Sequence, residues 1–141
     1  MTNTSIRWGL AVVATLLAEI TLIVLSILCV AVYSYAIHTG ETAEFYSAFA
    51  RVSGPWVSLI AGGPVFFLLA RWIRRRAPSV AVATAMAMAG LYVAIEIVVL
   101  LLWTADAGGL LPFVLLGFAL KVAGAWIGAG GIGARVLSKT V

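Results

Sequence analysis

Residues 8–37 read WGLAVVATLLAEITLIVLSILCVAVYSYAI, thirty residues that contain one charged side chain, Glu19. At about 1.5 Å of rise per residue, roughly 20 apolar residues form a helix that crosses about 30 Å of hydrocarbon. This stretch is about ten residues longer than that, so its helix must tilt or project beyond the bilayer near Tyr33 and Tyr35. It also exceeds the apolar core of a signal peptide, about 7–15 residues, so we expect a retained transmembrane helix.

The rest of the chain has the same character. Of 141 residues, 64% are hydrophobic and 10% are charged, whereas soluble domains have about 45–50% apolar and about 25% charged residues. Three further apolar segments cover about residues 55–73, 80–103 and 110–136, and the first of these is only marginally long enough to span. Transmembrane β-strands are only about ten residues long and alternate in polarity. We therefore predict an all-α polytopic membrane protein, a single domain over 1–141 with four transmembrane helices in a bundle.

The charged residues outside these spans predict the orientation. One side carries seven cations without an acid: Arg7, Arg71, Arg74, Arg75, Arg76, Arg135 and Lys139. The other side carries three acids and a single cation: Glu41, Glu44, Asp106 and Arg51. The positive-inside rule then places both termini in the cytoplasm, with Trp8 and Trp72 at the inner interface and Trp56 and Trp103 at the outer one. We expect the bacterial inner membrane.

We expect the basic loop to contact lipid headgroups and not nucleic acid. Its charge is confined to one short juxtamembrane turn, where topology and attraction to anionic lipid headgroups account for it. The chain lacks the size and aromatic layout of a nucleic-acid module. We therefore expect no nucleic-acid partner, and we assign headgroup contacts to the loop arginines Arg71, Arg74, Arg75 and Arg76.

The first outer loop, residues 38–54, is the largest segment predicted outside the membrane. Its stretch ETAEFYSAFARV, residues 41–52, places Phe45, Phe49 and Val52 on one helical face, which predicts a short helix lying in the interface. The single histidine, His38, is either an ordinary polar loop residue or a pH sensor. With one histidine, one cysteine (Cys29, expected as a small buried hydrophobe) and five acids, we expect no metal site, no cofactor, no disulfide and no enzyme activity.

Glycines in the last segment predict helix packing. The stretch GAWIGAGGIGA, residues 124–134, lies in an apolar span, where small residues allow helices to approach closely. We expect Gly117, Gly124 and Gly128 to form a subunit interface of a homo-oligomer or a contact with partner subunits. In the second segment, Gly62, Gly63 and Pro64 predict a kink or break in the helix, because proline removes a backbone donor and clashes with the preceding turn.

Three charged residues remain within the predicted hydrocarbon region. At 1.5 Å per residue, Glu19 lies about 3 Å inward of the midplane, Lys121 about 2 Å outward and Glu96 about 8 Å outward. An isolated charge at this depth costs about 2.5–3.5 kcal/mol on insertion scales. We therefore expect an ionised Glu19 paired with Lys121, and Glu96 as the titrating group. Polar side chains on the same helical faces extend this site: Thr15, Ser26 and Tyr92.

These residues leave two interpretations open. Intramembrane acids beside a broken helix are typical of ion and proton pathways, which favours transport or permeation of a small solute or proton. A charge pair can instead lock helices together or dock them on a partner, as in a non-catalytic accessory or assembly subunit of a larger membrane complex. Four helices leave little room for a path within one subunit, so a path would form between subunits.

The stretch WGLAVVATLLAEI, residues 8–20, resembles the opening helix of small multidrug resistance exporters. These are short four-helix proteins in which a glutamate of the first span exchanges protons for cationic drugs, and the resemblance implies that role for Glu19. It covers about 13 residues, and we do not assign membership. The tryptophan-glycine motif of that family's third span is missing from AMAMAGLYVAIEI, residues 85–97, and the 17-residue outer loop, Glu96 and Lys121 also depart from its pattern. A lysine beside the acid would disfavour cationic drugs.

Overall fold

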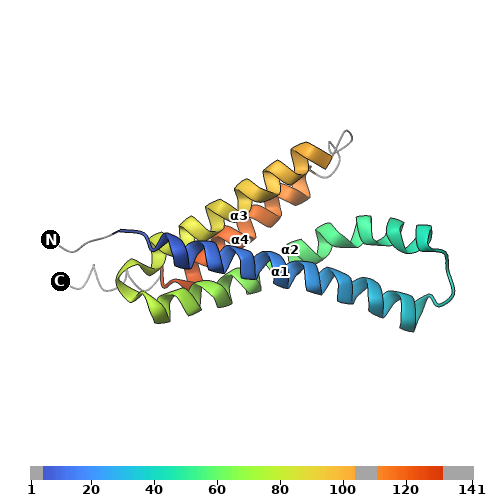
Figure 1. Ribbon diagram of the computed structural model, residues 1–141, viewed down its shortest axis with the longest axis horizontal. Helices are drawn as coiled ribbons and strands as arrows, with labels where there is room; N and C mark the ends of the chain where they lie inside the picture. The colour runs from blue at the N-terminus through green and yellow to red at the C-terminus, as the bar shows by residue number, and fades with distance from the viewer. Residues whose placement is uncertain (1–4, 104–110, 132–141) are drawn as a thin grey trace.

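The structure, a computed structural model, describes residues 5–103 and 111–131. Its four α-helices are α1 (Trp8–Val32), α2 (Ala43–Arg76), α3 (Ala81–Trp103) and α4 (Leu111–Gly128), with a π-helical turn η1 (Tyr33–Ile37) after α1 and a 3₁₀ turn η2 (Pro78–Val80) before α3. Helices α1 and α2 form one hairpin, α3 and α4 form another, and the two hairpins diverge away from the α2–α3 connection (Figure 1). The all-α prediction is confirmed.

Three of the helical segments have the length and apolar character to cross a membrane: Trp8–Ile37, Ala43–Arg76 and Pro78–Leu102. The fourth, Pro112–Gly128, is apolar but shorter. Large apolar side chains are exposed along α1, among them Leu16 and Ile20, as expected for a helix that faces lipid. These features indicate an integral membrane protein. Residues 104–110 and 132–141, with the predicted loop charges Asp106, Arg135 and Lys139, lie outside the described part of the chain.

The predicted interfacial helix is not a separate element, because it forms the first part of α2. Thr42 caps this helix, and its side chain accepts a hydrogen bond from the amide of Phe45 at 3.3 Å. The predicted apolar face turns toward η1, where the rings of Phe49 and Tyr33 stack with centroids 3.7 Å apart. This contact holds the start of α2 against the end of α1, so the chain continues as one helix of 34 residues.

Of the predicted kink or break at Gly62, Gly63 and Pro64, the break is wrong, since α2 continues through all three residues. Pro64 removes one backbone donor from the helix, but packing against α4 supports both sides of it. A Cβ atom at Gly62 would lie 2.8 Å from the Lys121 side chain, and a Cβ atom at Gly124 would collide with the carbonyl of Gly63. The two glycines therefore permit close contact with α4 and do not interrupt the helix.

The fourth helix ends eight residues before the predicted boundary at 136. Gly130 adopts a left-handed backbone conformation with φ of 91°. Its amide donates to the carbonyl of Ile127 at 3.0 Å, and the amide of Gly131 donates to the carbonyl of Trp126 at 2.9 Å. This pair of bonds around a left-handed glycine is the Schellman motif, which ends α-helices. The prediction counted these glycines as part of the span, although they end the helix.

The glycines predicted to form a subunit interface contact α2 of the same chain. Beside the Gly124–Gly63 contact, a Cβ atom at Gly128 would meet the carbonyl of Phe67, and one at Gly117 would lie 3.9 Å from Leu59. Helix α4 packs more extensively on α2 than on any other element. The close approach inferred from small residues is correct, but its partner lies within the chain.

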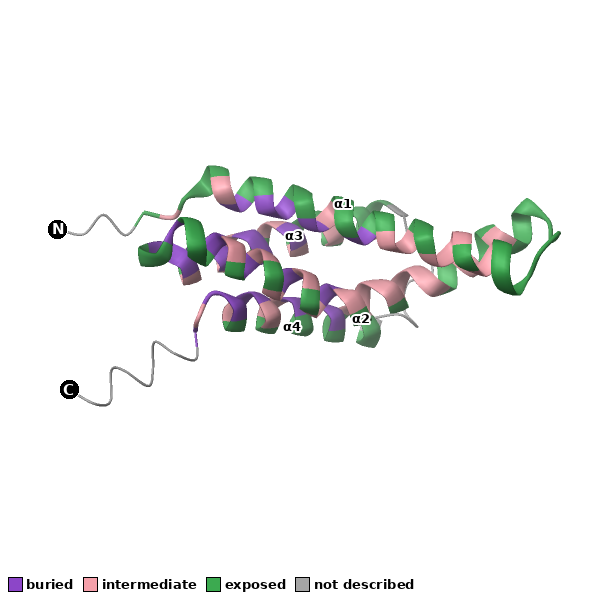
Figure 2. Ribbon diagram, turned by 90° about the horizontal axis from the view of Figure 1, so that it is seen from below, coloured by how far each residue is buried: buried purple, intermediate pink, exposed green. Residues whose placement is uncertain are grey.

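The buried core lies in the half of the bundle where α1 begins and α4 ends (Figure 2). Small side chains line it, so the helices approach closely: Ala11, Ala14 and Ala18 of α1, Ala85 and Ala89 of α3, and Ala125 of α4. Phe66 and Tyr92 fill its centre, with ring centroids 4.9 Å apart. Beyond this core the hairpins diverge (Figure 1), and α2, about 51 Å long at 1.5 Å per residue, is nearly twice as long as α4 at about 27 Å.

Candidate functional site

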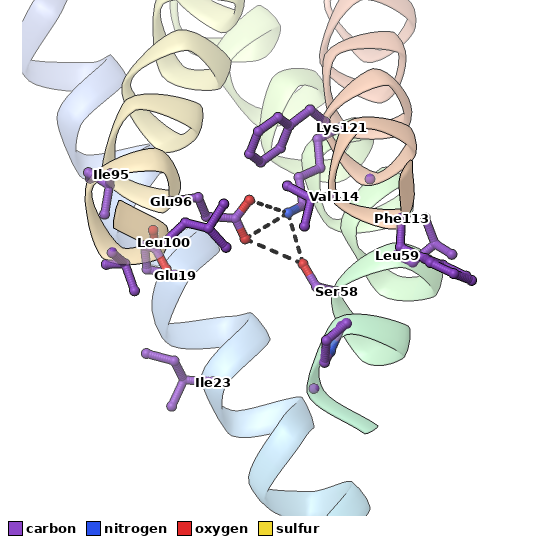
Figure 3. Close-up of a pocket in the computed structure, with 15 residues that line it drawn as sticks. Glu19, Ile23, Ser58, Leu59, Ile95, Glu96, Leu100, Phe113, Val114 and Lys121 are labelled. Atoms are coloured by element: carbon purple, nitrogen blue, oxygen red, sulfur yellow. Dashed lines mark hydrogen bonds and ion pairs between the residues drawn. The ribbon is translucent and has the colours of Figure 1, made fainter. Parts of the chain in front are cut away.

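A cavity of about 630 Å³ opens where the two hairpins diverge, and all four helices line it (Figure 3). Its walls are largely apolar, with Ile23 from α1, Leu59 from α2 and Phe113 from α4 among the lining side chains. Its polar side chains are the three predicted intramembrane charges and one serine: Glu19, Glu96, Lys121 and Ser58. The sequence prediction that the three charges share one site is therefore supported by the fold.

Lys121 is almost completely enclosed, with 2% of its side chain exposed. Its ammonium group donates to both carboxylate oxygens of Glu96, at 2.9 and 3.0 Å, and to the hydroxyl of Ser58 at 2.8 Å. The ring of Tyr92 lies 4.5 Å from the nitrogen and the ring of Phe118 lies 5.7 Å away, positions in which aromatic faces attract a cation. All three ammonium donors thus have acceptors.

Glu96 completes a neutral network that joins α2, α3 and α4. Besides the lysine, it accepts a hydrogen bond from the hydroxyl of Tyr92 at 2.9 Å and a long one from Ser58 at 3.5 Å. Tyr92 and Glu96 are four residues apart on α3, so they lie on one helical face. The carboxylate keeps 29% of its side chain exposed. Of the pair, the acidic member is therefore the more exposed one.

The absence of a side chain at Gly62 explains how the lysine reaches this position. A Cβ atom there would lie 2.8 Å from Cε and 3.0 Å from Cγ of Lys121. The lysine chain therefore lies across the backbone of α2 and reaches Ser58, one turn before Gly62. The helix-break prediction assigned Gly62 to backbone flexibility, whereas the structure uses it to admit the lysine.

Glu19 lines the cavity from α1 and takes no part in this network. Its Oε1 atom is buried and has no hydrogen-bond partner in the described part of the chain. The prediction that Glu19 pairs with Lys121 is wrong, because the lysine binds Glu96. Helix α4 packs against α2 and α3, and α1 also packs mainly against those two helices, so the partners of Lys121 come from the helices between α1 and α4.

The other predicted site residues divide into two groups. Tyr92 belongs to the network. Thr15 and Ser26 do not line the cavity: the Thr15 hydroxyl donates to the carbonyls of Ala11 and Met88, joining α1 to α3, and Ser26 donates to the carbonyl of Leu22. The arginines assigned to lipid headgroups lie at the end of α2, where Arg76 packs over the ring of Trp72 at 4.9 Å.

Ser58 was not predicted as a site residue. In the sequence it belongs to a row of small residues at positions 54, 58 and 62, which indicates packing alone. Its hydroxyl group was the available signal, since a polar side chain beside a gap at Gly62 can meet a charge from the facing helix. Within residues 5–103 and 111–131, no group of three metal-ligating side chains is present.

No protein-family model, curated protein or solved structure matches this chain. Its function must therefore be argued from its own geometry. What the arrangement offers is a neutral ion pair and one further carboxyl group in an apolar cavity at membrane depth.

Proposed function

We propose that this protein is a small integral membrane subunit whose cavity serves transport or permeation of a small solute or proton. The observation that carries this proposal is the Lys121–Glu96–Ser58 network at a cavity lined by all four helices. Charged residues inside membrane spans are costly and generally mark substrate, ion or proton pathways. A cavity between the helices of a bundle is also a usual position for a binding site.

Access from the cavity to the other side of the membrane would require assembly of several subunits. The half of the bundle beyond the cavity is filled by buried residues such as Phe66 and Met88. A path through one subunit would have to cross this packed core, so we infer that a continuous path forms between subunits of an oligomer. The predicted orientation, with both termini in the cytoplasm of a bacterium, is part of this proposal and is supported by the seven cations on one side of the sequence.

A second candidate is a non-catalytic accessory or assembly subunit. It is favoured by one observation, namely that every donor of Lys121 already has an acceptor inside the chain. Such a pair can hold α3 and α4 together without a ligand. Under this alternative the cavity would be covered by a partner subunit in the membrane.

Flux through reconstituted vesicles distinguishes the two candidates. We expect the protein to raise proton entry, followed with a trapped pH-sensitive dye, or solute entry, followed by light scattering during osmotic swelling. The paired substitution Glu96→Gln with Lys121→Met removes both charges of the ion pair together and should lower the rate about tenfold or more. Glu44→Gln removes an exposed acid outside the cavity and serves as the matched control.

The result that contradicts transport is equally specific. Vesicles that contain the protein would be as impermeable to protons and to the tested solutes as protein-free vesicles. Isolation of the native assembly with other membrane subunits in fixed ratio, together with that impermeability, would establish the accessory role.

A further inference from the structure

We propose that the ligand of this cavity is an uncharged hydrophobic alcohol or phenol that enters from the hydrocarbon of the bilayer and hydrogen-bonds through its hydroxyl group to Glu19. This inference rests on the proposed function, because the ligand occupies the same cavity. Three observations on the described residues support it: the cavity walls belong to the lipid-facing surface, the polar donors at the cavity are already engaged, and one carboxyl oxygen has no hydrogen-bond partner.

The walls of the cavity are also part of the surface that faces lipid. Ile23, Ile95 and Val99 line the cavity, and they are 55%, 40% and 47% exposed, respectively. An opening bordered by exposed apolar side chains within the membrane admits a molecule that is dissolved in the bilayer, without passage through water. A charged molecule is poorly soluble in hydrocarbon, because transfer of a charge into an apolar medium is costly. This route therefore favours an uncharged ligand.

The side-chain donors at the cavity already have acceptors. Lys121 donates to both oxygens of Glu96 and to the hydroxyl of Ser58, and Ser58 in turn donates to Glu96 at 3.5 Å. The network is neutral and is satisfied without a ligand. An ether or ketone, which can only accept hydrogen bonds, finds no free donor among these side chains. A ligand that donates a hydrogen bond is therefore required.

Glu19 provides the acceptor for such a ligand. It lines the cavity from α1 (Figure 3), and its Oε1 atom is buried without a hydrogen-bond partner in the described part of the chain. The terminal torsion of a glutamate is soft, so rotation about it can turn either oxygen toward the cavity. A carboxyl oxygen accepts a hydrogen bond in both protonation states, and a hydroxyl group can also accept one from the protonated acid. A hydroxyl ligand therefore fits Glu19 in either state.

Transfer from hydrocarbon to the cavity stabilises this ligand. A hydroxyl group without a partner is costly in an apolar medium, and so is the unpaired oxygen of Glu19. One hydrogen bond removes both costs, while Leu59, Phe113 and Val114 give the apolar body contacts like those it had in the bilayer. The volume of about 630 Å³ lies within the range of roughly 300–1,000 Å³ usual for small-molecule sites. This role of Glu19 requires an acceptor oxygen and not a charge, which distinguishes it from proton–cation exchange.

Two probes that differ by one hydrogen-bond donor test the proposal. Radiolabelled 4-octylphenol and its methyl ether, 4-octylanisole, are added separately to the full-length protein in phosphatidylcholine vesicles, whose lipids carry no hydroxyl donor. Saturable binding is the excess of sedimented probe over that in protein-free vesicles of the same lipid, measured at a low lipid-to-protein ratio. We expect the phenol to bind about tenfold more tightly than the ether, a factor that corresponds to about 1.4 kcal/mol.

Substitutions at Glu19 identify the acceptor. Glu19→Gln keeps a carbonyl acceptor and should retain the preference for the phenol, whereas Glu19→Leu removes the acceptor and should make the two affinities equal. Glu44→Leu, the same change at an exposed acid outside the cavity, should leave the preference unchanged. Because the readout is the ratio of two affinities for one variant, a general loss of stability does not produce the expected result.

A cavity-filling variant keeps the test valid if Glu19→Leu fails to fold. Gly54 lines the cavity, and a Cβ atom there would meet nothing within 4 Å. Gly54→Leu therefore adds volume to the cavity without a clash at its Cβ atom, and it should weaken the binding of both probes.

Four results would each overturn the proposal. These are equal affinity of the two probes for the unaltered protein, a phenol preference that persists in Glu19→Leu, binding that Gly54→Leu leaves unchanged, and tighter binding of the hydrophobic cation tetraphenylphosphonium than of the phenol. The binding assay is independent of flux. Phenol binding by a protein that shows no flux would refute transport alone, and flux by a protein without the phenol preference would refute the ligand class alone.

Discussion

The most direct test of the network is a double-mutant cycle on Lys121 and Glu96. Glu96→Gln leaves the lysine charge enclosed, with 2% of its side chain exposed, and removal of one partner from a buried pair costs about 3–5 kcal/mol. Lys121→Met leaves a carboxylate that is 29% exposed and still accepts from Tyr92 and Ser58, so we expect a smaller loss, about 1–3 kcal/mol. The two single variants should therefore be unequal, with Glu96→Gln the less stable.

The double variant should be more stable than the sum of the two losses predicts. Glutamine and methionine leave no unpaired charge at this position, and residues in direct contact show coupling energies of about 0.5–3 kcal/mol. We expect a coupling near the upper end, about 2 kcal/mol or more, because the lysine is enclosed and both members of the pair are hydrogen-bonded. Stability is measured as the free energy of unfolding in mixed micelles with increasing dodecyl sulfate, followed by circular dichroism.

The same measurement on a second pair identifies the partner of the lysine. Glu19→Gln combined with Lys121→Met should give a smaller coupling than the Glu96–Lys121 pair, because Lys121 forms its ion pair with Glu96 and not with Glu19. Glu44→Gln, an exposed acid on the first turn of α2, should change stability by less than about 0.5 kcal/mol. If Glu19 couples strongly to Lys121 while Glu96 and Lys121 are additive, the network described above is wrong.

Two further predictions concern packing and orientation. Gly124→Leu should destabilise the protein by about 1–3 kcal/mol or more, because its side chain would collide with the Gly63 carbonyl. Gly90→Leu on α3 places its Cβ atom in open space and should not destabilise the protein. Equal losses of stability in the unfolding assay would contradict the tight α2–α4 contact. In a Cys29→Ser background, a membrane-impermeant maleimide should label Ser47→Cys in intact cells and Arg75→Cys only after permeabilisation. The reverse labelling pattern would refute cytoplasmic termini.

The features that follow from bulk physical properties were predictable from the sequence. A hydrocarbon-length run of apolar residues has few folded forms other than a helix. The first and third segments, predicted at 8–37 and 80–103, accordingly match Trp8–Ile37 and Pro78–Leu102 closely. Small residues on α4 correctly indicated close helix contact. Each of these inferences depends on the composition or spacing within one segment.

Errors arose where a residue has two possible uses. Gly62 beside Pro64 predicts a flexible break if the helix is considered alone, but the same glycine is required where a lysine from another helix passes across the backbone. Gly130 continues an apolar glycine-rich run in sequence, yet its left-handed conformation ends α4. The face that contains Phe49 predicts contact with the lipid interface, whereas in the structure the ring of Phe49 stacks on Tyr33. In all three cases the partner lies elsewhere in the chain or depends on the turn geometry, and no periodicity within the segment reveals it.

The incorrect pairing of Lys121 shows why depth alone cannot identify partners in a membrane. On the rise of 1.5 Å per residue, the lysine lies about 5 Å in depth from Glu19 and about 6 Å from Glu96, a difference that one side-chain rotamer can cover. What distinguishes the two acids is rotation about the bundle and the order of the helices. Consecutive helices joined by a short connection usually pack side by side, and Glu96 and Lys121 lie on the consecutive helices α3 and α4. Glu19 lies on α1, which packs mainly against α2 and α3. Chain adjacency therefore favours the Glu96–Lys121 pair.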